Sequence, residues 1–461
     1  MKSLLKKPKI KSNIKSSLQK ALSIALIIAL PFTLTGCLGI GEDDNKPADS
    51  TSVVPSDEQI TLIWWGLFES EEDMQPLIDA YKAIHPNVTI EYSEKSLDDY
   101  QTSLDKVLTD GQPATTPDIF TIHNSWMGRY QNYLMPAPSE VTDASSFESA
   151  FYPIVNSDLV RDGQPYAIPL GMDSLALIYN KDLMSAKGYT TPSDDWTELF
   201  EQAQNLTQKT ATGTTYQRVG LSLGADEDSN EFWFDIFNLL LMQSGVQMLN
   251  STEDAAVFAS DSATQDAVEY FQSYEDEELW NASVKKDVAL FLEKKLAMYI
   301  APSWRLLDLV AYNDTYDLGL DIGIAPLPQL SSLEEEQVGW STYWAQGVSI
   351  DSQYYKVGWD FLNFATQQEQ LRLVFEHVTE DGTRAFGQIY PRKDMKSEMD
   401  SNEYLSVYAD EVSTSKGWNM VDGGKVRDVF KEWLNSEIDA EDAQGQVSLI
   451  ITDQGLLTSE P

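Results

Sequence analysis

The sequence predicts an α/β fold built around a parallel sheet. Between residues 60 and 123, apolar strand-like segments alternate with segments in which apolar residues recur at helical spacing. The order strand, helix, strand, helix, strand implies right-handed crossovers between parallel strands. About 400 residues follow residue 58, a length that suggests two or more domains.

The first five elements follow from apolar spacing and from residues that end a helix. Strands are expected over residues 60–65, 88–92 and 117–123, with helices over 71–84 and around 104–108 between them. His85-Pro86-Asn87 ends the first helix, because proline cannot continue the helical hydrogen bonding. One face of this helix is expected to carry Met74, Leu77, Ile78, Tyr81 and Ile84.

The rest of the chain continues with shorter strands and then becomes mainly helical after about residue 354. Further strands are expected over 166–169, 175–179, 219–223, 296–300, 322–325 and 348–350. Further helices are expected from residue 193 onward and near 231–245, 262–276 and 287–295.

The N-terminal residues 1–36 differ from the rest of the chain. They hold seven lysines and no acid, and an apolar run begins at Ala21, a pattern typical of a secretory signal. The only cysteine of the chain, Cys37, follows Leu34-Thr35-Gly36, which resembles the lipobox of bacterial lipoproteins. The resemblance implies a signal peptide over 1–36, acylation of Cys37 and a membrane anchor made by its lipid chains. An uncleaved N-terminal anchor is the alternative.

The chain is strongly acidic. It has 32 Lys and Arg against 73 Asp and Glu, and loss of the seven lysines in 1–36 leaves 25 against 73, a net charge of −48. Such a surface repels nucleic acids, so we expect no nucleic-acid partner. A single cysteine also excludes an internal disulfide. Residues 37–58 are acidic, rich in Ser and Pro and without apolar period, and are expected to be a flexible tether.

Several segments together resemble the extracellular solute-binding proteins of ATP-driven sugar importers, the maltodextrin-binding type. The likeness runs from about residue 60 to about 449. It rests on the order of ITLIWWGLFESEEDMQPLIDAYKAIHPNVTIEY, PDIFTIHNSW, YAIPLGMDSLALIYNKDLM, PSDDWTELFEQAQNLT, FLEKKLAMYIAPSW and DIGIAPLPQ.

The resemblance implies a two-lobed periplasmic-binding-protein type II fold, with a hinge and a ligand cleft between the lobes. The N-lobe would comprise 59–173 and about 345–395, and the C-lobe 174–344 and about 396–461. Such a protein captures a carbohydrate, here expected to be an oligosaccharide, and delivers it to the permease of an ABC importer. It would act as a monomer outside the cytoplasmic membrane, with no enzymatic step and no cofactor.

Candidate ligand-binding residues combine aromatic rings, which stack on the apolar face of a sugar, with planar polar groups that bond its hydroxyls. Trp304 matches the stacking tryptophan of the family, and Asp173 lies at the first crossing between lobes, where the family often has an acid. Other candidates follow strand ends or presumed crossings: Glu69, Asn124, Trp126, Trp233, Trp344 and Trp418. Three tryptophans in helical patterns, Trp196, Trp359 and Trp433, are expected in the core, as is one of Trp64 and Trp65.

Three other functions have some sequence support. Gly220-Leu-Ser222-Leu-Gly224 fits the nucleophile elbow of a serine hydrolase, but no helix pattern starts directly after Ser222. Asp226, Asp228 and Asn230 begin like a calcium loop, yet Glu231 stands where glycine is required, so no metal site is expected. An acidic, aromatic cleft would also suit a polyamine or another cation. A structural surface lipoprotein is the last alternative.

Overall fold

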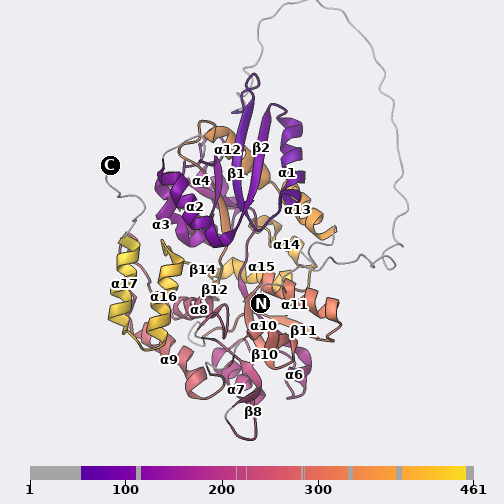
Figure 1. Ribbon diagram of the computed structural model, residues 1–461, viewed down its shortest axis with the longest axis vertical. Helices are drawn as coiled ribbons and strands as arrows, with labels where there is room; N and C mark the ends of the chain where they lie inside the picture. The colour runs from indigo at the N-terminus through magenta and orange to yellow at the C-terminus, as the bar shows by residue number, and fades with distance from the viewer. Residues whose placement is uncertain are drawn as a thin grey trace, which may run out of the picture.

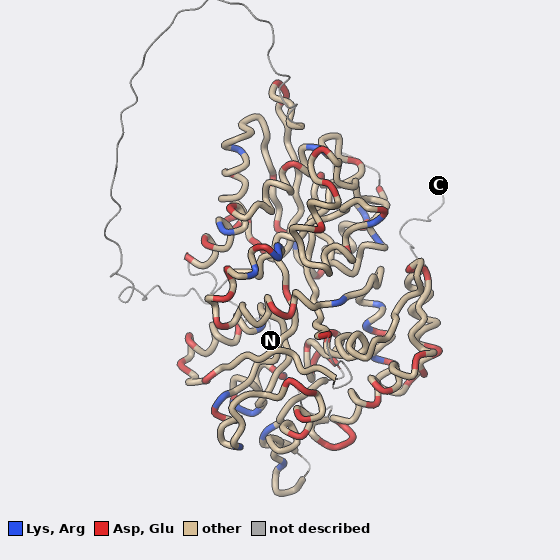
Figure 2. Tube along the Cα trace, turned by 180° about the vertical axis from the view of Figure 1, so that it is seen from behind, with Lys and Arg blue, Asp and Glu red and all other residues tan. Residues whose placement is uncertain are grey.

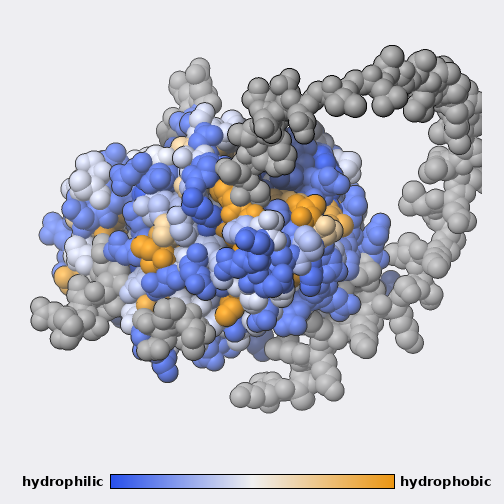
Figure 3. All heavy atoms as spheres, turned by 90° about the horizontal axis from the view of Figure 1, so that it is seen from above, coloured by the Kyte–Doolittle hydropathy of each residue, from blue (hydrophilic) through white to orange (hydrophobic). Residues whose placement is uncertain are grey.

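A computed structural model describes residues 53–110, 116–213, 215–224, 226–281, 284, 286–330, 336–380 and 387–452 (Figure 1). The expected signal peptide, Cys37 and residues 38–52 of the expected tether lie outside these described residues. Residues 53–58 do not fit a flexible tether: Val54 is buried, and the Asn87 side chain donates to the carbonyls of Pro55 and Glu58 at 2.7 Å. Acidic residues are spread along the chain in both halves of the molecule (Figure 2), and mostly hydrophilic residues surround small hydrophobic patches on the face seen from above (Figure 3).

The first lobe is built on a five-stranded sheet in the order β2-β1-β3-β13-β6. β1 pairs in parallel with both β2 and β3, as the alternation of strands and helices predicts. β13 comes from much later in the chain and runs antiparallel to β3 and β6. The strands are β1 (Ile60–Leu67), β2 (Val88–Lys95), β3 (Ile119–His123), β6 (Ala167–Pro169) and β13 (Trp344–Val348).

Helix α1 (Glu71–Ile84) begins at a capping box in which Ser70 and Asp73 bond each other's backbone N–H groups. Four of the five residues predicted for its apolar face are buried. Ile84 is the exception and is 58% exposed, because it is the last residue of the helix and extends past the sheet. α1 packs against α12 (Tyr355–Ala365) and α13 (Gln368–Glu380), which return from the C-terminal part of the chain (Figure 1).

The second lobe holds a sheet in the order β11-β7-β10-β9-β8. Only β9 and β10 are parallel here, and β7 runs antiparallel to both β10 and β11. Both sheets are therefore mixed, and the parallel sheet expected from the first elements is limited to β1, β2 and β3 in the first lobe. The strands are β7 (Leu175–Asn180), β8 (Gln208–Lys209), β9 (Tyr216–Leu221), β10 (Leu296–Pro302) and β11 (Ile322–Ala325).

The remaining helices cover the two sheets or connect them. The prediction for 262–276 matches α9 in both bounds, whereas the helix expected over 287–295 ends at Leu292, and Lys294 has a left-handed φ of 59°. The helices between α1 and α12 are α2 (Leu97–Thr109), α3 (Met127–Tyr130), α4 (Ala144–Ala150), α5 (Pro153–Leu159), α6 (Lys181–Ser185), α7 (Trp196–Leu206), α8 (Trp233–Gln243), α9 (Ser262–Asp276), α10 (Asp287–Leu292) and α11 (Ser303–Tyr316). Those after α13 are α14 (Lys396–Met399), α15 (Leu405–Thr414), α16 (Gly423–Leu434) and α17 (Ala440–Thr452).

The chain passes between the lobes after β6, and the later crossings lie side by side. β12 (Gly339–Trp340) precedes the second crossing and pairs in parallel with β14 (Ser415–Lys416), which follows the third crossing expected near residue 395. The Ser341 hydroxyl donates to Ser415 Oγ at 2.7 Å, which adds a side-chain bond to this short ladder. The strand expected over 348–350 is in fact β13, which begins at Trp344 and ends at Val348. The exact residue boundaries of the lobes stay a prediction.

The three tryptophans predicted for the core are buried, with exposed fractions of 5% or less. Trp433, on α16, packs on Phe237 and Phe258 and so attaches the C-terminal helices to the second lobe. Trp64 is buried in the first lobe, where its indole N–H donates to Gln346 at 2.8 Å, and Trp65 is half-buried. The prediction that one of this pair belongs to the core is confirmed.

A buried carboxyl near the hinge predicts a pH-dependent stability. Burial raises the pKa of Glu411, on α15, from 4.5 to about 8, although the Leu327 N–H donates to it at 2.8 Å. Between these values the folded chain holds a proton that the unfolded chain has lost, so unfolding becomes easier as pH rises. We expect the free energy of unfolding to fall by about 1–2 kcal/mol between pH 6.5 and pH 8.

Urea unfolding at a series of pH values measures this slope, and Glu411→Gln should remove it while keeping the acceptor for Leu327. Glu403→Gln, at an exposed glutamate just before the same helix, is the control that should keep the slope. Equal slopes in the protein and in Glu411→Gln would contradict the assignment.

Candidate functional site: the interlobe cleft

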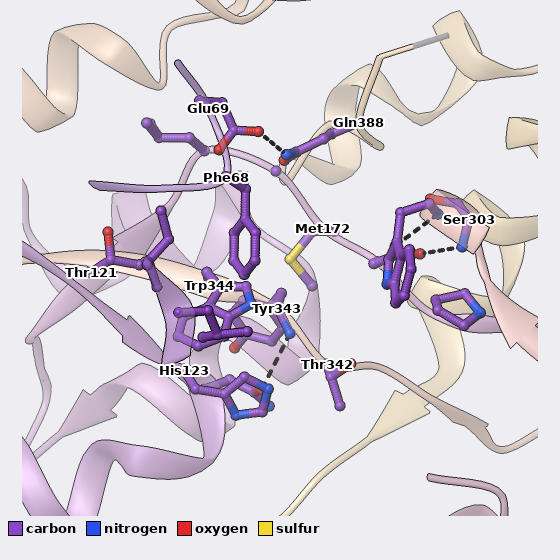
Figure 4. A pocket seen from close by; sticks show the side chains of 18 of the residues that line it. Phe68, Glu69, Thr121, His123, Met172, Ser303, Thr342, Tyr343, Trp344 and Gln388 are labelled. Carbon is purple, nitrogen blue, oxygen red and sulfur yellow. Dashed lines mark hydrogen bonds between the residues drawn. The ribbon is translucent and has the colours of Figure 1, made fainter. Parts of the chain in front are cut away.

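A cleft of about 840 Å³ lies between the two lobes, and both lobes and the crossings contribute to its lining. Figure 4 shows Phe68, His123 and Trp344 of the first lobe on one side, with Ser303 of the second lobe across from them. The ends of β1, β3, β10 and β13 all reach this cleft, as expected for a ligand site in an open α/β sheet.

Aromatic side chains from three different segments form the wall of the first lobe. Trp344 is the centre of the group, because Phe68, His123 and Trp126 all lie edge-on to it, with ring centroids 5.4, 5.0 and 5.2 Å away. Phe68 is 46% exposed and has a left-handed φ of 71°, a strained conformation for a residue with a side chain. Burial lowers the pKa of His123 to about 4, so its imidazole is neutral near pH 7.

The wall of the second lobe carries Trp304, in the first turn of α11, which is 44% exposed. Phe232 lies edge-on to it with a centroid distance of 5.5 Å and an interplanar angle of 73°. The Trp304 ring is therefore a partly exposed aromatic surface in the cleft, and its contact with a ligand stays a prediction.

Asp173 lies at the first crossing and binds the start of α11. Its Oδ1 accepts from the backbone N–H groups of Ser174 at 2.8 Å and Ser303 at 2.9 Å, and its Oδ2 accepts from Trp304 N–H at 3.4 Å. Burial raises the pKa of Asp173 to about 6 even though these bonds favour the ionised form. Asp173 lines the cleft, but its bonds go to the backbone, so contact with a ligand hydroxyl stays a prediction.

Asn124 and Glu69 also line the cleft, and both bond other parts of the chain. The Asn124 amide donates to Asp158 at 2.8 Å and accepts from the Tyr343 N–H at 3.2 Å, which ties the end of β3 to the second crossing. Glu69 accepts from the Gln388 side chain at 2.5 Å, a bond visible in Figure 4. Gln388 is exposed, so the Glu69–Gln388 pair is open to a ligand.

The two remaining tryptophan candidates differ. Trp418 lines the cleft but is only 8% exposed, and its indole N–H donates to Asn238 at 2.8 Å. Trp233 is fully buried at the start of α8 and does not line the cleft; its neighbours Phe232 and Phe234 do. The expectation for Trp233 was wrong because neighbouring side chains at a helix start point in different directions, which sequence spacing alone did not show.

Several lining residues were missed by the sequence reasoning, among them Phe68, Phe232, Arg427 and Gln388. Phe68 adjoins the candidate Glu69, and Phe232 adjoins Trp233, so the correct segments were identified with the wrong residue. Arg427 and Gln388 lie in the helical C-terminal part of the chain, where no strand end marks a site. Their approach to the cleft depends on tertiary packing.

Arg427 differs from the other arginines in the described part of the chain. Its guanidinium lies over the Phe234 ring, 5.3 Å from the centroid, and makes no hydrogen bond or ion pair there. Arg129, Arg161 and Arg305 by contrast each pair with a carboxylate. The cleft lining therefore includes a guanidinium with no acceptor among the described residues.

The hydrolase and metal hypotheses lack structural support. Ser222 is 1% exposed, and the next helix, α8, begins only at Trp233, so the sharp strand-to-helix turn of a nucleophile elbow is absent from this described segment. No group of three or more potential metal ligands occurs among the described residues. Within the same residues, no helix has the length and apolar character needed to cross a bilayer.

Two α/β lobes joined by three crossings, with an aromatic cleft between them, define a two-lobed ligand-binding protein with the type II periplasmic-binding fold. The chain matches the family model of bacterial extracellular solute-binding proteins over residues 68–371, more than half of its length. It belongs to this family.

Named relatives and solved structures agree with this assignment. The chain is 26% identical over 227 residues to a protein of Brucella abortus (strain 2308) described as a binding protein, covering 48% of this chain and 52% of that protein. It is 23% identical over 277 residues to the maltotriose-binding protein of Pyrococcus abyssi (strain GE5 / Orsay), covering 58% and 53%. The matches thus span about half the length of these relatives.

A solved cyclo/maltodextrin-binding protein complexed with maltotetraose aligns with a TM-score of 0.68 and 19% identity, over 89% of this chain and all of that one. At this identity the likeness shows the fold.

The Asp173 contacts predict the effect of removing the carboxylate. Asp173→Ala leaves the first N–H groups of α11 without acceptors, so we expect a loss of about 1–2 kcal/mol in the free energy of unfolding. Asp173→Asn keeps one acceptor oxygen and should lose less. Urea unfolding at pH 7.5 measures both, with Asp321→Ala, at an exposed ion pair with Lys181, as the control that should change little. An Asp173→Ala protein as stable as the unmodified one would contradict the capping role.

Proposed function

We propose that this protein captures a carbohydrate in the interlobe cleft and delivers it to the permease of an ABC importer. The observation that carries the proposal is the pair of exposed aromatic surfaces, the Phe68–Trp344 group on one lobe and Trp304 on the other. A pyranose ring has apolar C–H faces, so such surfaces bury it well while its hydroxyls remain free to bond polar groups.

Polar side chains in the cleft lining can form hydrogen bonds with the hydroxyls of the sugar. Arg427 offers N–H donors without an acceptor among the described residues, and the Glu69–Gln388 pair offers both an acceptor and a donor. Asp173 and Asn124 hold the adjacent backbone, with a ligand contact proposed as a second role for each. Asn124, Trp126 and Trp418 extend the lining beyond the central rings.

The cleft favours a ligand larger than one sugar ring. Its volume of about 840 Å³ lies toward the upper end of the range for small-molecule pockets, roughly 300–1,000 Å³. Aromatic groups on opposite lobes can each accept a different ring of an oligosaccharide. Contact with both lobes would stabilise the closed form, which supports hinge closure on binding.

The sequence and the family also support a proposal for where the protein is located and how it is anchored. We propose that Cys37 carries lipid chains that anchor a monomer to the outer face of the cytoplasmic membrane, with the residues between Cys37 and Val53 as tether. The N-lobe and C-lobe bounds given above are part of the same proposal. No reaction on the ligand is involved.

A polyamine or another cation is the competing ligand, supported by the acidic lining residues Glu69, Asp173, Glu231, Asp235 and Asp308. Several of these acids already bond the chain: Asp173 accepts from backbone N–H groups, and Glu231 and Asp308 pair with Arg305. The positive charge of Arg427 also opposes a cation. These contacts favour a sugar.

Calorimetry and intrinsic fluorescence against a panel of oligosaccharides and polyamines test the proposal. We expect saturable binding of an oligosaccharide that falls at least about tenfold in Trp304→Ala, because the stacking surface of the second lobe is lost. Tyr316→Ala is the matched control: Tyr316 is a 63% exposed aromatic residue at the other end of α11 and outside the cleft.

Binding of polyamines and of no sugar would replace the proposal with the cation-binding alternative. Equal sugar affinity in Trp304→Ala and the unmodified protein would remove Trp304 from the site.

A further inference from the structure

The residue after Trp304 covers one face of its ring. The Arg305 guanidinium carbon lies 4.5 Å from the centroid of the Trp304 indole. Trp304 lines the cleft and is 44% exposed, whereas Arg305 does not line it and its side chain is only 13% exposed. The guanidinium therefore covers the indole from the protein side and leaves the opposite face to the cleft.

Consecutive side chains on a helix point in different directions, so other residues must hold the Arg305 guanidinium over the Trp304 ring. Two carboxylates supply it: Glu231 and Asp308 each pair with the Arg305 guanidinium, Asp308 at 3.0 Å through Nη1 and Glu231 through Nη2. Asp308 lies one turn along α11, and Glu231 comes from the loop before α8. The guanidinium plane is thus held from two directions.

The loop that presents Glu231 is itself fixed. The Glu231 backbone N–H donates to Asp287 at 3.0 Å, and the Tyr299 hydroxyl donates to the same carboxylate at 2.7 Å. Phe232, the next residue, touches the Trp304 ring edge-on. The acidic segment that begins like a calcium loop therefore ends in two residues that support the Trp304 ring.

We propose that Arg305 is a positioning residue for the ligand: held by Glu231 and Asp308, it fixes the Trp304 ring so that one face is open to a single sugar ring. The effect on affinity rests on the proposed function, but the effect on Trp304 itself does not. A planar guanidinium matches the indole face, whereas the ammonium of lysine is a point charge, so lysine should replace arginine poorly. A ring fixed before binding loses less conformational entropy when the sugar stacks.

Fluorine NMR of the protein labelled with 5-fluorotryptophan tests the positioning without any ligand. The Trp304 signal is identified by its loss in Trp304→Phe. Arg305→Met should shift and broaden this signal while leaving most of the other eleven tryptophan signals in place. Arg372→Met, which removes an arginine that pairs with Glu398 away from the cleft, is the matched control and should leave the Trp304 signal unchanged. An unchanged Trp304 signal in Arg305→Met would overturn the proposal.

A double-mutant cycle tests the consequence for binding, with the oligosaccharide that binds most tightly in the panel as the probe. Arg305→Met should weaken binding by about tenfold in the unmodified protein and hardly at all in Trp304→Ala, because Arg305 acts through the ring. Arg305→Lys should resemble Arg305→Met. Equal losses in both backgrounds would overturn the proposal, because Arg305 would then act without Trp304.

The two measurements separate this proposal from the proposed function. If no oligosaccharide binds, the proposed function fails, and the fluorine signal of Trp304 still decides whether Arg305 fixes the ring.

Discussion

The carboxylate of Asp173 is the contact on which the geometry of the cleft depends. It lies where the chain first leaves the N-lobe, and it accepts from the first two backbone N–H groups of α11 in the C-lobe. The first of those groups belongs to a residue 130 positions later in the chain. Since Trp304 is the second residue of α11, the same bonds fix the hinge and the base of the aromatic ring. Burial raises the pKa of this carboxyl to about 6, because the desolvation of the carboxylate outweighs the hydrogen bonds that favour its ionised form.

Around this contact, most charged groups of the cleft are engaged within the protein. Arg305 neutralises Glu231 and Asp308, and Glu69 accepts from Gln388. Arg427 is different, because it is held over Phe234 with no acceptor among the described residues. A strongly acidic protein therefore presents a cleft whose accessible features are aromatic faces, the Glu69–Gln388 pair and the Arg427 guanidinium. This separates the overall charge, which governs solubility and repulsion of polyanions, from the local chemistry that selects a ligand.

The hinge combines short pairing with buried polar groups. β12 and β14 pair over only two residues each, next to Glu411, and Asn124 with Asp158 and Tyr343 joins the end of β3 to the second crossing. Backbone bonds also join these segments, since Asn124 N–H donates to the Tyr343 carbonyl at 3.0 Å and Met420 N–H donates to the Ser125 carbonyl at 2.9 Å. Such a hinge permits a rigid-body closure in which the two aromatic surfaces approach each other.

The sequence by itself determined the strand and helix order of the first lobe, the bounds of α9 and the placing of Trp304 after β10, because apolar periodicity and helix-ending residues act over a few positions. It also pointed to the loops at Glu69, Asn124 and Trp344, since strand ends in α/β sheets meet at one edge. Tertiary structure alone decided that Trp233 is buried while Phe232 faces the cleft, that Asp173 bonds Ser303, and that Glu231 holds Arg305 from 74 residues away. The direction of a side chain and its distant partner depend on packing between segments, and no local spacing contains that information.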